Sequence, residues 1–119
     1  MMKFNPTVPI YLQIMDSIKK DIVTGTLAHG ERVESVRVLS EKFGVNLNTM
    51  QRACSELERE GVIYTQRGVG SFVTEDEKVV HSLKQEMCGG LVDEFINGMR
   101  GIGFTNNEIL KTVEEALAK

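Results

Sequence analysis

The sequence predicts a mainly helical α+β fold, with an N-terminal winged helix-turn-helix over residues 1–75 and a two-helix arm over residues 76–119. Three observations support this. Three segments of helical periodicity follow one another, each ended by a glycine. Two β-like runs then flank an Arg-Gly-x-Gly tip. After Thr74 the composition becomes acidic and a long helical pattern begins. The order helix, helix, helix, strand, wing, strand is typical of a winged helix-turn-helix.

The first predicted helix begins after Pro9, whose missing N–H costs nothing at a helix start. Its apolar stripe recurs every three or four residues and comprises Ile10, Tyr11, Ile14, Met15, Ile18, Ile22 and Val23. Gly25 ends this helix. Residues 26–34 form a connection with room for a short strand at Arg32 and Val33.

A second helix is expected to begin at its N-cap Ser35 and to end at Gly44. Its expected buried positions are Val36, Leu39 and Phe43. A third helix follows a three-residue turn and runs to about Glu60, with Asn46 or Asn48 as its N-cap. The expected inner face of this third helix comprises Met50, Ala53, Cys54 and Leu57.

The tail carries apolar residues spaced by threes and fours from Val79 to Met99. Gly89 and Gly90 interrupt the pattern, which leaves one bent helix or two shorter helices as alternatives. Thr105 to Glu108 form a capping box ahead of a last helix, with Phe104 in the staple position.

Two helices with broad apolar stripes cannot bury them against each other alone, so a symmetric homodimer is expected. The expected dimerisation residues are Leu83, Met87, Leu91, Phe95, Met99, Ile109 and Val113. The alternative is that the tail folds back on its own winged domain.

The net charge of −3 argues against a strongly basic nucleic-acid footprint. Residues 1–75 are neutral, with nine Lys/Arg and nine Asp/Glu, and the tail supplies the whole excess. A DNA-binding domain without net charge is expected to make few phosphate contacts and to rely on contacts with the bases. No run approaches the roughly 20 apolar residues of a membrane span, and the start lacks a signal-peptide pattern, so cytoplasm is expected. Cys54 and Cys88 are interpreted as reduced, buried residues.

The outer face of the third helix carries polar side chains at i, i+3, i+4 and i+7, namely Asn48, Gln51, Arg52 and Ser55. Asn and Gln suit adenine, Arg suits guanine, and Ser suits either. Thr49 is placed to reach a phosphate at the helix start. The alternative is an ordinary solvated face, but such a face usually mixes Glu and Lys, and here the acids begin only at Glu56.

Two further groups fit a DNA interface. Arg37, at the start of the second helix, is placed to clamp a phosphate or to reach a base, and its alternative is a surface salt bridge with Glu34 or Glu41. Arg67 sits at a hairpin tip where Gly68 and Gly70 permit positive φ and a close backbone approach. A wing of this kind is suited to contact a minor groove or the DNA backbone. The alternative interpretation of this segment is a plain hairpin turn.

With these residues in place, the chain resembles the GntR family of bacterial transcription regulators from about Pro9 to Val73. The matching stretches are Ser35 to Ser40, Gly44 to Met50, Leu57 to Ile63 and Arg67 to Val73. The resemblance adds Ser35 and Asn46 to the implied DNA contacts. His29 and Glu34 stand where the family usually has prolines, and Leu47 stands where many members carry Arg or Pro.

Only about 45 residues follow the wing, which is similar to the short YtrA-type branch of the family. The sequence motif typical of that branch matches the residues from Val45 to Ala53. The resemblance implies a dimeric repressor, often of nearby operons for ABC-type transporters, with an unknown small-molecule effector left open. Symmetry then predicts a pseudo-palindromic operator in double-stranded DNA, with half-sites about 10 bp apart.

Other functions fit less well. The sequence has no P-loop, no Ser/His/Asp set and no zinc-protease motif, so no enzyme and no cofactor are expected. A metal-responsive regulator would need ligands from His81 and Cys88, and there is no second Cys/His cluster. A winged helix used only for protein–protein contact would have no need of the polar stripe on the third helix.

Overall fold

The computed structural model describes residues 2–119, and it confirms the predicted mainly helical fold with a small three-stranded sheet. The elements are α1 (Ile10–Val23), β1 (Arg32–Val33), α2 (Val36–Phe43), α3 (Leu47–Arg59), β2 (Ile63–Gln66), β3 (Gly70–Val73), α4 (Glu77–Gly101) and α5 (Asn106–Leu117). The chain forms two compact units, one ending at Leu83 and the other beginning at Lys84. This division lies within α4, later than residue 75, where the sequence places the end of the winged segment.

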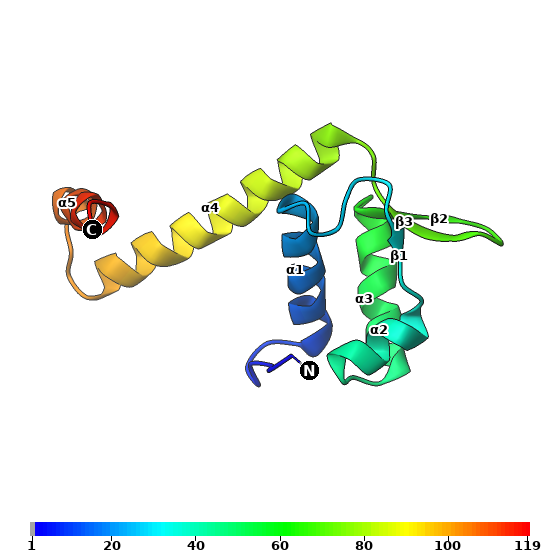
Figure 1. Ribbon diagram of the computed structural model, residues 1–119. Helices are drawn as coiled ribbons and strands as arrows, with labels where there is room; N and C mark the ends of the chain where they lie inside the picture. Colours follow the sequence, from blue (N-terminus) through cyan, green and yellow to red (C-terminus); the bar gives the residue numbers. More distant parts are fainter. Residues whose placement is uncertain (1) are drawn as a thin grey trace. The chain divides into compact units, whose positions relative to one another are not determined.

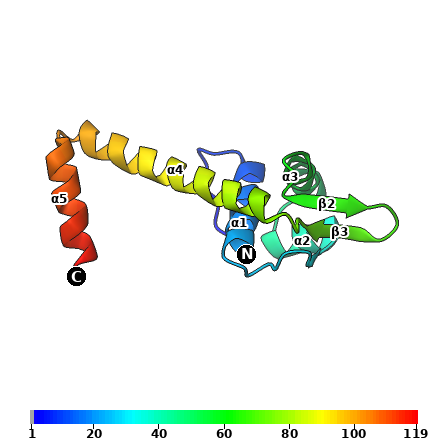
Figure 2. The ribbon, with the colours of Figure 1, turned by 90° about the horizontal axis from the view of Figure 1, so that it is seen from above.

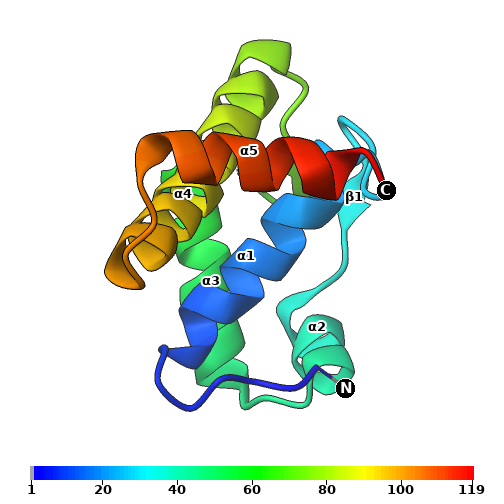
Figure 3. The same ribbon diagram turned by 90° about the vertical axis from the view of Figure 1, so that its left-hand side faces the viewer.

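In the N-terminal unit, α1 and α2 both pack against α3 (Figure 1). Figure 3 shows α1 in front of α3 and crossing it obliquely. The largest side chains that are almost completely removed from solvent are Ile14, Ile22, Met50, Leu57 and Val73. Burying one such side chain stabilises the fold by about 1.5–3 kcal/mol. This core therefore fixes the outer face of α3 on a rigid support.

The two helix starts around α3 have the caps that the sequence predicts. The Ser35 hydroxyl accepts a hydrogen bond from the backbone N–H of Val38 at 3.2 Å. The Asn46 side chain accepts one from the N–H of Thr49 at 2.8 Å, which makes Asn46 the N-cap of α3 and leaves Asn48 in the first turn. Gly44 ends α2 with φ +70°, a conformation that favours glycine.

The three strands pair antiparallel in the order β1-β3-β2. Tyr64 on β2 faces Phe72 on β3, and their rings stack with centroids 5.6 Å apart. Figure 2 shows β2 and β3 side by side and closed by a loop. In that loop Gly68 has φ +79° and the Val69 N–H donates to the Gln66 carbonyl at 2.9 Å. The predicted hairpin is present, with strand ends shifted by one residue.

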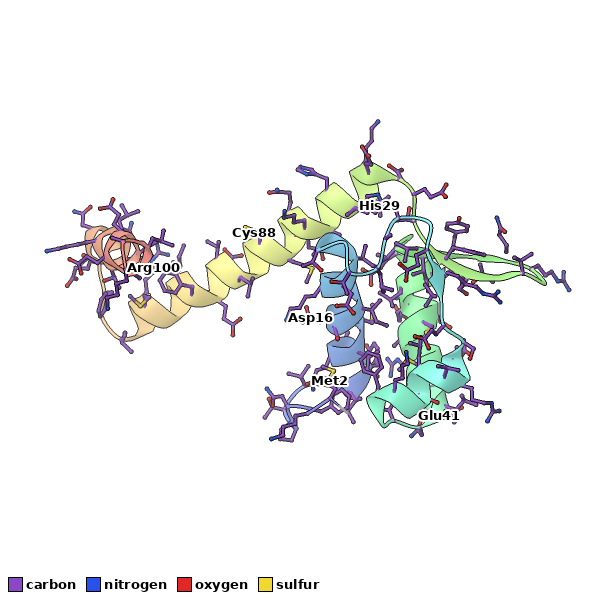
Figure 4. The ribbon with its side chains drawn as sticks, in the orientation of Figure 1. Met2, Asp16, His29, Glu41, Cys88 and Arg100 are labelled. Carbon is purple, nitrogen blue, oxygen red and sulfur yellow. The ribbon has the colours of Figure 1, made fainter. Side chains whose placement is uncertain are left out.

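Several expected core positions are less buried than the pattern predicts. Ile10 is 42% exposed because it is the first residue of α1, and Val36 and Phe43 are half-buried at the two ends of the short helix α2. Cys54 is buried as expected, whereas Cys88 is exposed on α4, so the prediction for Cys88 is wrong (Figure 4). Helix ends and the lightly packed tail both offer few neighbours to cover a side chain.

In the tail, α4 continues through Gly89 and Gly90, which settles the alternative of two shorter helices. The capping box ahead of α5 is present. The Thr105 N–H donates to the Glu108 carboxylate at 3.0 Å and the Glu108 N–H donates to the Thr105 hydroxyl at 3.3 Å. The Thr105 backbone N–H and, second to it, the Thr105 side chain lower the pKa of the Glu108 carboxyl. Among residues 2–119, no helix is both long and apolar enough to cross a bilayer.

Candidate nucleic-acid interface

The outer face of α3 presents the predicted polar stripe to solvent. Asn48, Gln51, Arg52 and Ser55 are all exposed. The Gln51 amide nitrogen donates to the Ser55 hydroxyl at 3.1 Å, so two members of the stripe already hold each other in place. A hydrogen bond between neighbouring turns limits the rotamers of both side chains. The stripe is therefore a partly ordered row of donors and acceptors.

The residues at the start of α3 are partly used by the fold itself. The Asn46 oxygen is occupied by the N-cap bond, and the N–H of Thr49 is the donor of that bond. Thr49 is also half-buried. The amide nitrogen of Asn46 and the hydroxyl of Thr49 donate no hydrogen bond within residues 2–119, so these are the groups that remain for a ligand at this end.

Arg52 lies over the ring of Tyr11 on α1, with its guanidinium carbon 3.8 Å from the ring centroid. This distance is well within the range of a cation–π contact. The sequence assigns Tyr11 to the core stripe of α1, and its side chain is half-buried. The contact depends on how α1 packs on α3, so no local pattern in the sequence signals it.

Arg37 is exposed at the start of α2 and forms no ion pair within residues 2–119. Its expected alternative partner Glu34 pairs with Lys42 instead. Glu41, labelled on α2 in Figure 4, also makes no ion pair with it. The surface salt bridge considered for Arg37 is therefore not formed, and its guanidinium is available to an anion.

The acidic end of α3 is partly neutralised by its own neighbours. The three carboxylates concerned are Glu56, Glu58 and Glu60. Their partners are Arg59, the Thr65 hydroxyl at 2.8 Å and the Lys19 ammonium at 2.8 Å, respectively. The two ion pairs, of Glu56 and Glu60, reduce the repulsion that a phosphate backbone would meet near α3, whereas the Thr65 hydroxyl leaves the charge of Glu58 in place. The N-terminal half of the helix, which has no acid, is the half suited to a negative ligand.

The wing carries an exposed cation at its tip, and a second one lies beside the first residue of β3. Arg67 is exposed and forms no ion pair within the described chain. Gly70, the first residue of β3 after the tip, has φ +148°, and a Cβ on it would lie 3.0 Å from the Nε atom of Arg32. Glycine thus allows Arg32 of β1 to lie against β3. The sequence identifies Arg32 only as part of a short strand and misses this position beside the wing.

A depression of about 480 Å³ lies between the sheet and the start of α2. Its lining includes Arg32, Ser35, Cys54 and Gly70. The N-cap of α2 and the first residues of β3 therefore border the same surface. Burial raises the pKa of the Cys54 thiol, which keeps that wall of the depression uncharged.

The expected dimerisation residues fall into three groups. Leu83 and Ile109 are buried within the chain itself, and Met87, Met99 and Val113 are half-buried. Leu91 and Phe95 are 67% and 43% exposed. Further exposed apolar residues of the tail are Val92, Ile102, Leu110 and Leu117.

Metal-ligating side chains are not grouped among the described residues. Across residues 2–119, no set of three or more His, Cys, Asp or Glu side chains is arranged to hold a metal ion. His81 and Cys88 are both exposed on α4. The geometry gives no support to the alternative of a metal-responsive regulator.

Comparison with known proteins adds a family match. Residues 10–73 match the family model described as bacterial regulatory proteins, gntR family. The chain is 37% identical over 112 residues to the uncharacterized HTH-type transcriptional regulator YhcF of Bacillus subtilis (strain 168), covering 94% of this chain and 93% of that protein. It is 41% identical over 70 residues to the HTH-type transcriptional repressor YtrA of the same organism, covering 59% of this chain and about half (54%) of YtrA.

Solved structures agree in fold over the same region and beyond it. A GntR family transcriptional regulator from Listeria monocytogenes superposes with a TM-score of 0.87 and 39% identity, covering 94% of this chain and 98% of that one. The structure of AraR(DBD) in complex with operator ORX1 matches with a TM-score of 0.56 and 26% identity, covering 61% of this chain and 93% of that one.

Proposed function

This chain belongs to the gntR family of bacterial regulatory proteins, and we propose that it acts as a dimeric repressor on a pseudo-palindromic operator in double-stranded DNA. It is a DNA-binding transcription regulator and not an enzyme. The observation that carries the proposal is the exposed stripe on α3, whose arginine has no ion-pair partner within the described chain.

In this proposal the N-terminal half of α3 enters the major groove. Asn48, Gln51 and Arg52 then meet base edges, for which their amide and guanidinium groups are suited. Arg37 and Ser35 contact phosphates at the flank of the site. Arg67 reaches the adjacent minor groove or backbone from the wing. A related DNA-binding domain, AraR(DBD), forms a complex with its operator, which supports this use of the shared fold.

The dimer is supported by the surface of the tail. Of the described residues 84–119, Ile109 alone among the apolar side chains is buried. A helical pair that leaves most of its apolar side chains in water lacks a core of its own. A second copy supplies the missing surface through a C2 interface. Two recognition helices are then presented to half-sites about 10 bp, or roughly 34 Å, apart.

Repression follows from competition for the same DNA. A dimer bound across a promoter excludes RNA polymerase, and YtrA, one of the relatives, is a transcriptional repressor. We propose a nearby operon as the target, with ABC-type transporter genes as the first to examine. The site of action is then the bacterial cytoplasm, where the chromosome lies.

Selection of bound duplexes from a random DNA pool tests this function directly. We expect enrichment of a sequence with two inverted half-sites, spaced by about one helical turn. The measurement is the enrichment over bulk competitor DNA at modest ionic strength. If no duplex is preferred under these conditions, the proposed operator binding is wrong.

Replacing Arg67 by Ala should weaken binding to the selected duplex and lower the slope of log K against log salt by about 1. The physical reason is the loss of one phosphate or minor-groove cation at the wing tip. Titrations at several salt concentrations measure both quantities. The matched control is Lys20→Ala, which removes the same charge from an exposed residue of α1 paired with Asp16. An unchanged salt slope in the Arg67 variant would remove the wing from the interface.

A further inference from the structure

Tyr11 on α1 touches the one arginine of the α3 stripe. The guanidinium carbon of Arg52 lies 3.8 Å from the centroid of the Tyr11 ring. Arg52 is exposed and Tyr11 is half-buried. The contact joins two helices that pack together in the core of the same unit. A residue of α1 is thus in direct contact with a side chain that α3 offers to DNA.

The contact restricts Arg52 without using its hydrogen-bonding groups. An exposed arginine samples many rotamers, and this freedom is lost when the side chain binds a base. A guanidinium held over an aromatic ring has already lost much of it. Arg52 forms no ion pair and donates no hydrogen bond within residues 2–119, so its N–H donors remain available to a ligand.

The start of α1 is itself held firmly, which gives the ring a fixed position. The Gln13 side chain accepts a hydrogen bond from the Asn5 N–H at 2.8 Å. It also donates to the carbonyls of Asn5 and Val8 at 2.7 and 2.9 Å. Because Gln13 ties the preceding segment to the first turn of α1, the backbone that carries Tyr11 is braced on both sides.

We propose that Tyr11 is a positioning residue for specificity: its ring holds Arg52 in the orientation in which the guanidinium reads a guanine in the major groove. This inference rests on the proposed function, because it requires α3 to enter DNA. The Tyr11 hydroxyl forms no hydrogen bond within the described chain. We therefore assign the positioning of Arg52 to the face of the ring and not to the hydroxyl. Arg52 contacts the base, and Tyr11 acts through Arg52.

The first test compares Tyr11→Leu with the matched control Tyr11→Phe, which keeps the ring. Both are titrated with the duplex selected from the random pool and with the same duplex altered at the base pair where Arg52→Ala loses discrimination. We expect Tyr11→Leu to weaken binding of the selected duplex by about two- to fivefold and to reduce discrimination at that base pair. Tyr11→Phe should stay within about twofold of the original protein.

Three outcomes would overturn the inference. The first is that Tyr11→Leu binds as the original protein does. In the second, Tyr11→Leu weakens all duplexes equally, which indicates a merely structural role. In the third, Tyr11→Phe loses as much as Tyr11→Leu, which assigns the effect to the hydroxyl. If Tyr11→Leu melts below the assay temperature, Tyr11→Met takes its place, because an unbranched side chain fills the same space.

A double-mutant cycle separates positioning from an independent contact. In the Arg52→Ala background, Tyr11→Leu should cause no further loss of affinity, since there is no guanidinium left to position. A loss that adds fully to that of Arg52→Ala would overturn the inference. Failure of the original protein to bind any duplex would contradict the proposed function itself, whereas normal binding without coupling contradicts only the role of Tyr11.

Discussion

Replacing Leu91 by Asp in α4 is expected to convert the proposed dimer to a monomer and to weaken binding to the full operator by about 10²–10⁴-fold. Leu91 is 67% exposed, and Phe95 lies one helical turn further along the same helix. A carboxylate within an apolar interface loses its hydration without gaining a partner. Once the dimer dissociates, each winged unit binds a half-site separately and the benefit of linkage disappears.

Asn97→Asp is the matched control for this experiment. Asn97 is exposed on the same helix, and the substitution adds the same charge without removing an apolar contact. Sedimentation measures the oligomeric state, and titration with the full operator and with an isolated half-site measures binding. The half-site affinity should be equal in both variants. A Leu91→Asp protein that stays dimeric would contradict the proposed role of this face.

The choice of Leu91 over other tail residues depends on their burial. Leu83 and Ile109 are predicted from the sequence as dimerisation residues, but the chain itself already covers them. A polar substitution at either position is therefore expected to destabilise the monomer as well. Periodicity identifies the apolar side of a helix, yet it does not tell which part of that side is covered by the same chain and which part is left for a partner.

Features governed by neighbouring residues were predictable from the sequence. The N-cap at Ser35, the stop at Gly44 and the capping box at Thr105 each depend on a few adjacent positions. Which of Asn46 and Asn48 caps α3 could not be predicted, because either residue can cap a helix. The backbone after Gly44 decides it, since only Asn46 takes the extended conformation of an N-cap.

The continuity of α4 through Gly89 and Gly90 illustrates a different limit. Each glycine costs about 1 kcal/mol relative to alanine in a helix interior. Propensity alone therefore leaves a break and a continuous helix close in free energy. Once a helix is nucleated, every further residue adds a hydrogen bond, and α4 extends over both glycines.

Contacts between distant residues lie beyond sequence patterns altogether. Tyr11 meets Arg52 because α1 packs on α3, and Arg32 meets Gly70 because β1 pairs with β3. Neither pair has a spacing that a period or a motif would reveal. Both add to the candidate interface, one by restraining the side chain of Arg52, which we propose to read a base, and the other by placing a cation beside the wing.

Arg52→Ala should cost about 1–3 kcal/mol of operator affinity and relax the preference at one base pair. Arg52 is the one arginine of the exposed stripe, it has no ion-pair partner within residues 2–119, and its side chain is held over Tyr11. A guanidinium of this kind can form two parallel hydrogen bonds to guanine. Its loss removes those bonds and leaves the rest of the interface in place.

Arg52→Lys separates the charge from the geometry of this contact. Lysine keeps the positive charge but lacks the planar fork that binds a guanine edge with two hydrogen bonds. We expect Arg52→Lys to retain more of the affinity than Arg52→Ala while losing most of the preference at the same base pair. Competition with duplexes changed one base pair at a time measures both effects. If Arg52→Ala leaves affinity and preference unchanged, α3 does not read the major groove through this residue, and the placement of the helix in DNA must be revised.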